Sequence, residues 1–414
     1  MLSTIYSVSA LLLSFGILCL GHGLNNTLLG VRATIESYPE WVTGLMMSGY
    51  FMGFIIGTSI CAKLIPKVGQ IRTFAAFASI SSSISLLHVL FINEITWVIL
   101  RIVYGVCIAA LYMVIESWLN ALSTKQNRGR ILSVYMVISF LSLALGQIFV
   151  FVAEPSQYIL FAIVSILISF SLVPLSLSKT KQPEEIESGH FSFKKLYKIS
   201  PLATIGCAAT GLTLGAFWGL SAVYFTQLGL PPREVAILIS ATFLGGLIFQ
   251  WPIGYLSDLF DRRVAISLSL FLSTVISIQF IHLAGDSKNN IDISLVIISL
   301  LFGGFSYTLY SLFIALANDF LEPQYIVKAS GGLITFHAIG AMLGPFLVSI
   351  LMSLIGNNGL FVFIAVINSI IFTFALIQII RGRKIPEKTS ESFISIPKTG
   401  TAIIELDPRQ EESS

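Results

Sequence analysis

Arg101 and Glu116 stand in a segment, 96–119, that contains no other charged residue. A charge that faces lipid is expensive, so both side chains must face the interior of the protein. On a helix of about 100° per residue, the two share one face with Tyr112. On such a buried face a permanent cation could bind an anionic group, and a carboxyl could accept a proton.

Each of the two residues also has a structural interpretation. Arg101 could hold backbone carbonyls instead of a ligand, and Glu116 could brace one end of the segment by pairing with Arg72, Arg128 or Arg130. Arg101 and Glu116 lie about 22 Å apart by helical rise, which is too far for a direct ion pair. Both interpretations of each residue therefore stay open.

The first apolar segment, 6–30, carries a second polar face. His22, Asn25, Asn26 and Arg32 fall within an arc of about 120° on a helix. The two asparagines offer donors and acceptors to a bound solute, and Arg32 could add a cation at the mouth of a cavity or lie in the following loop. His22 could exchange a proton near neutral pH, or it could serve only as a buried hydrogen-bond partner.

Later segments contribute aromatic residues and a third candidate for proton exchange. Tyr307 and Tyr310 share one helix face, and Trp218 follows glycines at helical spacing. Their polar tips suit the wall of a cavity, although aromatic stripes also serve as packing. His337 precedes a seam of small residues and could either exchange a proton or be structural.

The sequence lacks the other familiar constellations of catalysis. It contains no Gly-x4-Gly-Lys-Ser/Thr phosphate loop, no His-Glu-x2-His or Cys-x2-Cys metal spacing and no Gly-x-Ser-x-Gly elbow. The five histidines are scattered along the chain, which argues against a membrane-embedded enzyme with its catalytic groups at one depth. We therefore expect no catalytic residue, no cofactor and no bound metal.

The composition indicates what must position these side chains. Hydrophobic residues make up 55% of the 414 residues and charged residues only 11%, whereas soluble domains carry about 25% charged residues. A chain this poor in charge cannot cover a soluble surface, and a net charge of +3 does not indicate a partner such as nucleic acid. The four cysteines lie in apolar stretches, where a disulfide framework is implausible. A polytopic protein in a lipid bilayer remains.

Twelve segments meet the requirement of about 20 mostly apolar residues for one membrane crossing. They run approximately over 6–30, 42–64, 73–92, 96–119, 131–152, 157–177, 201–228, 235–256, 264–284, 292–317, 330–355 and 359–380. Each must be a helix, because an open strand cannot satisfy its backbone in lipid. The predicted fold class is therefore an all-α polytopic membrane protein with 12 transmembrane helices.

Basic residues set the orientation of these helices. With the N-terminus inside, 20 of the 24 Lys and Arg residues fall on the cytoplasmic side, three fall outside and Arg101 lies within the membrane. An excess of basic residues marks the cytoplasmic side. Both termini are therefore predicted to be cytoplasmic.

The chain divides into two halves of six helices each. The first half covers 1–177 and the second covers 201–380, with a cytoplasmic linker at 178–200 between them. The polar segment 381–414 is predicted to be a flexible cytoplasmic tail. It begins with basic residues that suit the inner leaflet.

Matching residues recur in the two halves in a consistent register. Gly53 corresponds to Gly245 at an offset of 192, and Asn120 corresponds to Asn318 at an offset of 198. The second offset is larger by six residues, and these six fit in the longer outer loop at 285–291. Two six-helix halves in parallel repeat are the layout of secondary transporters, whose binding site lies between the halves.

Several motifs resemble those of the major facilitator superfamily. They are Gly254-Tyr-Leu-Ser-Asp258 followed by Arg262-Arg263, a partial first-half copy at Gly69 and Arg72, the run Arg101-x3-Gly105-x3-Ala109, and Arg128-Gly129-Arg130. The second-half copy departs from the family at Leu259 and Asp261, and the first-half copy has Pro66 in place of its Asp. The resemblance implies that the segments 6–30, 96–119, 201–228 and 292–317 line a central cavity and that cytoplasmic residues form a gate. The implied gate residues are Gly69, Arg72, Glu116, Arg128, Arg130, Asp258, Arg262 and Arg263.

Further residues resemble the YcaD-type bacterial branch of this superfamily. They are Glu116-Ser117, Gly146-Gln147, Gln250-Trp251-Pro252 and Gly344-Pro345. The segment 131–152 lacks the Gly-Pro that ends the signature of drug antiporters, and the segment 6–30 lacks an embedded acid. The resemblance therefore implies a fold and a transport role without a substrate.

We predict a secondary active transporter of a bacterial inner membrane that moves a small solute by alternating access and is coupled to protons. The alternatives are an exporter of amphipathic or drug-like compounds, and a lipid-handling membrane protein. The candidate cavity residues are Arg101, Asn25, Asn26, Arg32, Tyr112, Trp218, Tyr307 and Tyr310, and the candidate proton carriers are Glu116, His22 and His337. The expected solute is anionic or amphipathic, and the expected oligomeric state is a monomer.

Overall fold

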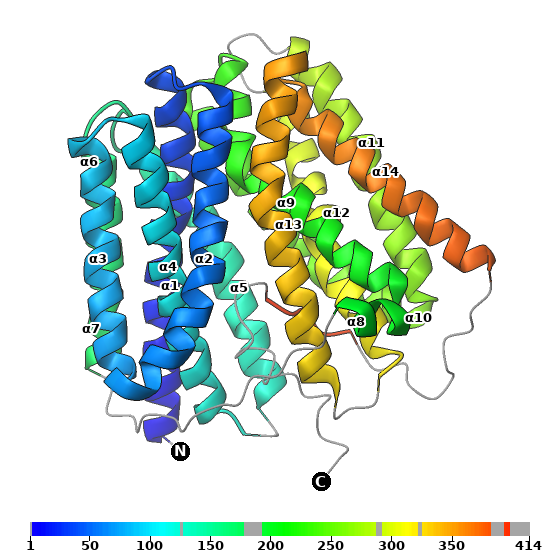
Figure 1. The fold of residues 1–414 in the computed structure, drawn as a ribbon, viewed down its shortest axis with the longest axis horizontal. Helices are drawn as coiled ribbons and strands as arrows, with labels where there is room; N and C mark the ends of the chain where they lie inside the picture. The colour runs from blue at the N-terminus through cyan, green and yellow to red at the C-terminus, as the bar shows by residue number, and fades with distance from the viewer. Residues whose placement is uncertain are drawn as a thin grey trace.

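The computed structural model describes residues 2–124, 127–177, 193–286, 292–321, 325–381 and 393–397 (Figure 1). Twelve of the described helices are long and apolar enough to cross a membrane. Each of the 12 predicted spans corresponds to one of them, so the predicted all-α class is confirmed. The first part of the predicted linker and most of the predicted tail lie outside the described residues.

The first half comprises six spans, two of which are interrupted. Its elements are α1 (Leu2–Ile35), α2 (Glu40–Val68), α3 (Gln70–Leu90), α4 (Glu94–Leu122), α5 (Arg128–Gly146) continued by the 3-10 helix η1 (Gln147–Phe151), and α6 (Ile159–Phe170) continued by α7 (Leu172–Ser176). The second interruption precedes Pro174, which has no N–H for a helical hydrogen bond and collides with the preceding turn.

The second half repeats this plan after a short helix at the membrane edge. Its elements are α8 (Phe193–Ile199), α9 (Pro201–Gln227), α10 (Pro232–Leu259), α11 (Arg262–Asp286), α12 (Ile293–Asn318), α13 (Ile326–Ile355) and α14 (Gly359–Ile380). The sequence did not indicate α8, which lies within the predicted linker.

Polar residues at the membrane edge start the helices that bear the site. The side chain of Asn93 accepts hydrogen bonds from the N–H groups of Ile95 and Thr96 at 3.1 and 3.2 Å, and so caps α4. Ser200 caps α9 through the N–H of Ala203 at 3.4 Å. These bonds satisfy N–H groups that have no partner within their own helix.

The two halves pack their helices in the same pattern. In the first half α2 packs on α4, α1 on α5 and α3 on α6, and in the second half α10 packs on α12, α9 on α13 and α11 on α14. A Cβ at Gly53 would overlap the carbonyl oxygen of Ile102, and one at Gly245 would overlap that of Leu300. These two contacts are related by the offsets 192 and 198, so the repeat seen in the sequence recurs in the packing.

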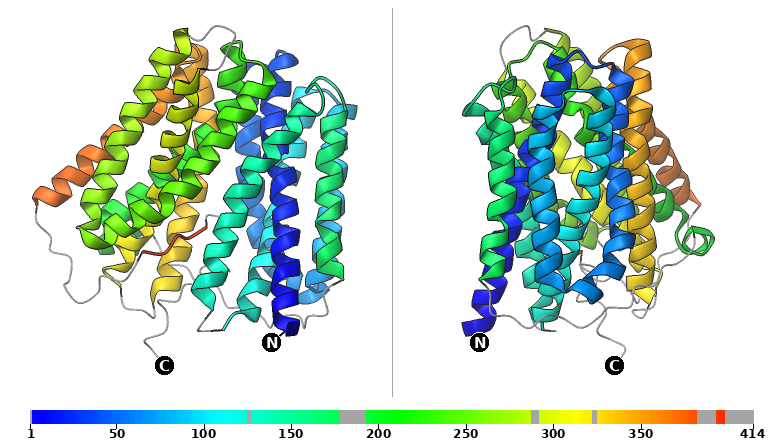
Figure 2. Two further views of the ribbon diagram at one scale, coloured as in Figure 1. Left: turned by 180° about the vertical axis from the view of Figure 1, so that it is seen from behind. Right: turned by 60° about the vertical axis from the view of Figure 1, so that its left-hand side comes forward.

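The halves touch at the outer side and diverge toward the side that carries both termini (Figures 1 and 2). Their contacts run between α2 and α13, α5 and α10, and α1 and α9. At the outer seam the N–H of Phe346 donates to the hydroxyl of Ser48 at 3.1 Å. Gly44 leaves room there for Ser349 and the carbonyl of Pro345. The described conformation is therefore closed outside and splayed toward the cytoplasm.

A labelling experiment tests this orientation. The four native cysteines are buried, so a membrane-impermeant maleimide should report mainly on introduced cysteines. Phe260→Cys, at a position 64% exposed between α10 and α11, should react only from the cytoplasmic side. Gln157→Cys, exposed beside the start of α6, should react only from outside. The excess of Lys and Arg marks the opposite side of the protein as cytoplasmic. Reaction of Phe260→Cys from outside would refute the topology.

Candidate functional site

A cavity of about 190 Å³ lies between the two halves. Its wall is drawn from α1, α2, α4 and α5 in the first half and from α9, α10, α12 and α13 in the second. Among the described residues, none from α3, α6, α11 or α14 lines it. Aromatic and aliphatic side chains form most of the wall, and its polar side chains other than tyrosine and tryptophan are His22, Ser139, Ser311 and His337.

The structure divides the predicted cavity residues into two groups. Tyr112, Trp218 and Tyr307 line the cavity, together with two of the proton candidates, His22 and His337. Asn25, Asn26, Arg32, Arg101 and Tyr310 do not line it. All five are nevertheless buried, so each has a role in the protein wall or in packing around it.

Arg101 lies behind the wall of the cavity and is 1% exposed. Its Nη2 donates to the Oδ1 of Asn26 at 3.0 Å, and its guanidinium carbon lies 4.8 Å from the ring centre of Tyr50 and 5.8 Å from that of Tyr104. No carboxylate pairs with it in the described part of the chain, and its Nε and Nη1 have no hydrogen-bond partner there. Ring quadrupoles and an amide dipole therefore carry the stabilisation of this cation.

Asn26 connects this cation to the other half of the protein. Its Nδ2 donates to the backbone carbonyl of Trp218 on α9 at 2.6 Å. A chain of contacts thus runs from α4 through α1 to α9. Side-chain amides have both a donor and an acceptor, which is why an asparagine can make both of these bonds at once.

His22 forms part of the cavity wall where the two halves meet. Its Nδ1 lies 3.3 Å from the hydroxyl of Tyr104, and its Nε2 lies 3.2 Å from the hydroxyl of Tyr50. Its ring stacks on Trp218 with the ring centres 5.7 Å apart. Since both ring nitrogens have a hydroxyl partner that can donate or accept, the hydrogen bonds can reverse when the imidazole changes its protonation state.

His337 occupies the wall of the second half. Its Nδ1 lies 3.3 Å from both the hydroxyl of Thr210 and the carbonyl of Cys207 on α9. The ring centre of Tyr310 lies 4.6 Å away. Tyr310 thus supports His337 from behind, although the sequence predicted that it lines the cavity itself.

Glu116 and Arg32 lie away from the cavity. Glu116 is fully buried and accepts a hydrogen bond from the hydroxyl of Tyr135 at 2.8 Å. Arg32 pairs with Glu36 at 2.6 Å and donates to the carbonyls of Pro155 and Ser156. Arg32 therefore ties the outer end of α1 to the loop before α6.

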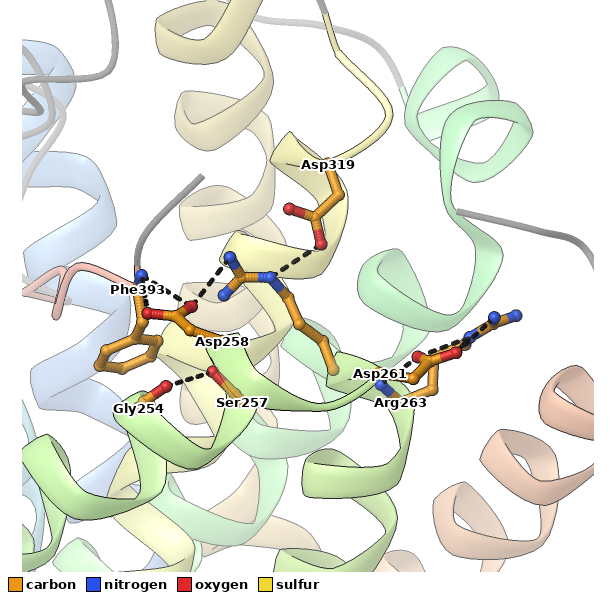
Figure 3. A network of polar contacts seen from close by, with 8 residues as sticks. Gly254, Ser257, Asp258, Asp261, Arg263, Asp319 and Phe393 are labelled. Carbon is orange, nitrogen blue, oxygen red and sulfur yellow. Dashed lines mark hydrogen bonds and ion pairs between the residues drawn. The ribbon is translucent and has the colours of Figure 1, made fainter. Parts of the chain in front are cut away.

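An ionic network joins the cytoplasmic ends of α10, α11 and α12 (Figure 3). Arg262 pairs with Asp258 at 3.1 Å and with Asp319 at 2.8 Å. Asp258 and Arg262, two of the predicted gate residues, are therefore paired, and their role in a gate stays a prediction. The sequence analysis did not identify Asp319, because it lies just after Asn318 at the end of its span and belongs to no motif.

A second pair flanks this network at the start of α11. The Nη2 of Arg263 lies 2.6 Å from the Oδ2 of Asp261, and the Arg263 backbone N–H donates to the same carboxylate at 2.9 Å. Partial burial acts to raise the pKa of Asp261, but the hydrogen bonds and charge of Arg263 together lower that pKa below its usual value. The carboxylate is therefore ionised at neutral pH, and the pair persists there.

The first half carries a weaker version of the gate. Gly69 turns the chain from α2 into α3 with φ at +92°. Arg72 and Arg130 are exposed and Arg128 is half-buried. Among the described residues none of the three arginines forms an ion pair. Within the part of the chain that the structure describes, ion pairs therefore link cytoplasmic charges in the second half and not in the first.

Two repeated six-helix halves around a shared cavity are the architecture of many membrane transporters. The model of the Major Facilitator Superfamily matches residues 11–231 and 203–407. The chain therefore belongs to this superfamily. It is a multi-pass transporter of a bacterial inner membrane rather than an enzyme.

Individual relatives and solved structures agree with this assignment. The chain is 27% identical over 372 residues to an uncharacterized MFS-type transporter YcaD of Escherichia fergusonii, covering 89% of this chain and 95% of the relative. It is 26% identical over 385 residues to an uncharacterized MFS-type transporter of Enterobacter sp. strain 638, covering 92% and 98%. These matches confirm the resemblance to the YcaD-type branch.

Two solved transporters share the fold. A bacterial homologue of the lysosomal transporter Spinster, in an inward-facing and occupied conformation, superposes with a TM-score of 0.74 at 12% identity and covers 92% of this chain and 98% of its own. The nucleoside transporter NupG gives a TM-score of 0.71 at 11% identity, covering 93% and 100%. At this identity the likeness concerns the fold alone.

A double-mutant cycle tests the cage around Arg101. Asn26→Leu should lower the free energy of unfolding by about 1.5–3 kcal/mol, because it leaves a buried charge without its acceptor. Arg101→Met should lower it by about 1 kcal/mol, because it removes the buried charge and leaves only the neutral Oδ1 of Asn26 without its donor. Chemical unfolding of the purified protein in detergent measures both.

The double variant Arg101→Met with Asn26→Leu provides the control for this cycle. The double variant should lose less unfolding free energy than Asn26→Leu alone, because it contains no buried charge that needs an acceptor. Strictly additive losses would mean that the hydrogen bond between the two residues contributes nothing to stability.

Proposed function

We propose that this transporter moves a compact amphipathic solute through the cavity between its halves by alternating access. The observation that carries the proposal is the position of the cavity. Its wall comes from both halves, the outer seam is closed by contacts such as that of Ser48 with Phe346, and the halves diverge on the cytoplasmic side (Figure 2). Rocking the halves about such a site would expose it to either side in turn.

The chemistry of the wall supports an amphipathic solute over a simple anion. Phe51, Phe54, Phe140 and Phe243 contribute apolar surface to the cavity. Of the residues that the structure describes, the two histidines are the acidic or basic side chains that line it. Flat apolar groups stack well on such rings. The guanidinium of Arg101 stands behind this wall, so an anionic group would not meet it directly in this conformation.

The two cavity histidines support coupling to protons as part of the same proposal. His22 and His337 line the cavity on opposite halves, whereas Glu116 lies outside it. Histidine is the side chain that changes its charge most readily near neutral pH. A proton taken up by either ring would therefore meet the same space as the solute, which is the arrangement that coupled exchange requires.

Filling the cavity tests the proposed binding site. Ala338→Trp places a large side chain at a position that lines the cavity. Ile339→Trp places the same group at the next residue of α13, which is 38% exposed on the surface of the protein. A bound ligand stabilises the folded protein by mass action, by about 2.7 kcal/mol of unfolding free energy at one hundred times the Kd, and so raises the thermal midpoint. Ala338→Trp should abolish the shift and Ile339→Trp should keep it.

The probes for this screen are 1-naphthol, naphthalene-1-sulfonate and 1-naphthylmethylammonium, which share one ring system and differ in charge. Uptake of the stabilising probe into proteoliposomes then measures transport. If none of the three shifts the midpoint of the parental protein, the amphipathic class is wrong. If Ala338→Trp binds as the parent does, the site lies elsewhere.

Replacing the histidines tests proton coupling separately. His337→Gln and His22→Gln keep hydrogen bonding but cannot carry a proton. In proteoliposomes a pH gradient should accelerate uptake of the probe by the parental protein. At least one of the two variants should lose this acceleration while it retains exchange of the probe at equal pH.

His282→Gln serves as the matched control, because His282 is exposed near the outer end of α11. It should respond to the pH gradient as the parent does. Acceleration that survives in both cavity variants, alone and combined, would assign the transporter to uniport or to another ion.

A further inference from the structure

A short segment of the tail lies inside the molecule. Residues 393–397 form an extended chain between the two halves on their cytoplasmic side (Figure 1). Ile396 is 1% exposed, and it lines the central cavity together with Pro397. An apolar side chain of the polar tail thus reaches the space that we propose for the solute.

The backbone of this segment is held by side chains of the second half. The N–H of Phe393 donates to both carboxylate oxygens of Asp258, at 2.9 and 2.7 Å (Figure 3). The N–H of Ile396 donates to the hydroxyl of Ser311 at 3.3 Å. The ring of Phe393 packs on Gly254, where a Cβ would overlap it. A charged acceptor, a neutral acceptor and a notch for a ring therefore occur in one groove.

The sequence of the segment suits an apolar space. A buried N–H without an acceptor is costly, and the N–H of Ile396 has its acceptor in Ser311. Pro397 has no N–H at all. The two residues that reach the cavity therefore leave no backbone donor unsatisfied there.

We propose that the cytoplasmic mouth of the cavity is a docking groove for an extended peptide, and that its occupant is this chain's own segment 393–397. The docked segment plugs the cavity against the cytoplasm. It also keeps the cytoplasmic ends of the two halves apart, because it fills the space that they would close. The plug is a property beyond transport itself, so it holds whichever solute the cavity binds.

Accessibility of the cavity tests the plug without any solute. Ser139→Cys places a thiol in the cavity wall on α5, and a membrane-impermeant maleimide added to inside-out vesicles reaches it through the cytoplasmic mouth. Adding Ile396→Asp should raise the labelling rate on the order of tenfold, the factor that corresponds to losing the burial of one isoleucine. Ile396→Val should leave the rate close to that of Ser139→Cys alone.

Variants of the groove separate release of the plug from general damage. Asp258→Asn, combined with Ser139→Cys, should also raise the labelling rate, because it removes the charged acceptor of Phe393. Asp261→Asn is the matched control, since Asp261 pairs with Arg263 and makes no contact with the segment. An unchanged rate in both Ile396→Asp and Asp258→Asn would overturn the plug, as would an equal rise in Asp261→Asn. A thermal midpoint equal to that of the parent confirms that each variant is folded.

Cross-linking identifies the occupant. A disulfide between Ile396→Cys and Ser311→Cys should form under mild oxidation within one chain, because the Ile396 N–H contacts the Ser311 hydroxyl. The product should migrate as a monomer in non-reducing gels, and it should slow the labelling of a cavity thiol at position 139. Disulfide-linked dimers would assign the groove to the tail of a second copy, and absence of any cross-link would show that the segment does not dock.

Discussion

A guanidinium in the membrane must be shielded from lipid on every side, and the centre of this protein is arranged around that requirement. Arg101 is 1% exposed and is stabilised by Asn26 and by the ring of Tyr50 instead of a carboxylate. Asn26 also holds the carbonyl of Trp218 on the other half. The contact that cages the cation is therefore also a contact that joins the halves. Separating the halves there would alter the surroundings of the charge, so the solvation of Arg101 and the position of α9 are physically linked.

Within each half, neighbouring helices pack backbone against backbone at glycines. A Cβ at Gly105 would overlap the carbonyl of Tyr50, and one at Gly303 would overlap that of Thr242. Such backbone-to-backbone approach inside each half leaves no room for independent helix movement. The seam between the halves also includes such an approach at its outer end, where Gly44 leaves room for Ser349 and the carbonyl of Pro345. Hydrogen bonds of Ser48 and Asn26 join the halves further. Because each of these hydrogen bonds contributes only about 1 kcal/mol net, the seam depends on this packing as well as on its polar contacts.

The sequence predicted those features that follow from hydrophobicity and periodicity. Arg101 was identified because it is a charge in an apolar segment, and its partner Asn26 was identified because it lies on the polar face of the first span. That polar face also included His22, which lines the cavity. Neither pattern could show that Tyr50 lies in the cavity wall beside the cation, because that depends on how α2 packs. The role of Asp319 could not be predicted either, since its pairing with Arg262 joins two helix ends that are far apart in sequence.

The cytoplasmic side is asymmetric, and one substitution within the repeat accounts for much of this. The position that holds Asp258 in the second half holds Pro66 in the first, at the offset of 192. Without a carboxylate there, the first half has neither the pair with an arginine nor an acceptor for an extended backbone. The second half has both, because Asp258 contacts Arg262 and the N–H of Phe393. A carboxylate near a helix end can accept several donors at once, so the same residue can hold the loop to its arginine and the tail to its groove. The tail segment is consequently attached, through Asp258 and Ser311, to the half whose cytoplasmic loops are already linked by ion pairs.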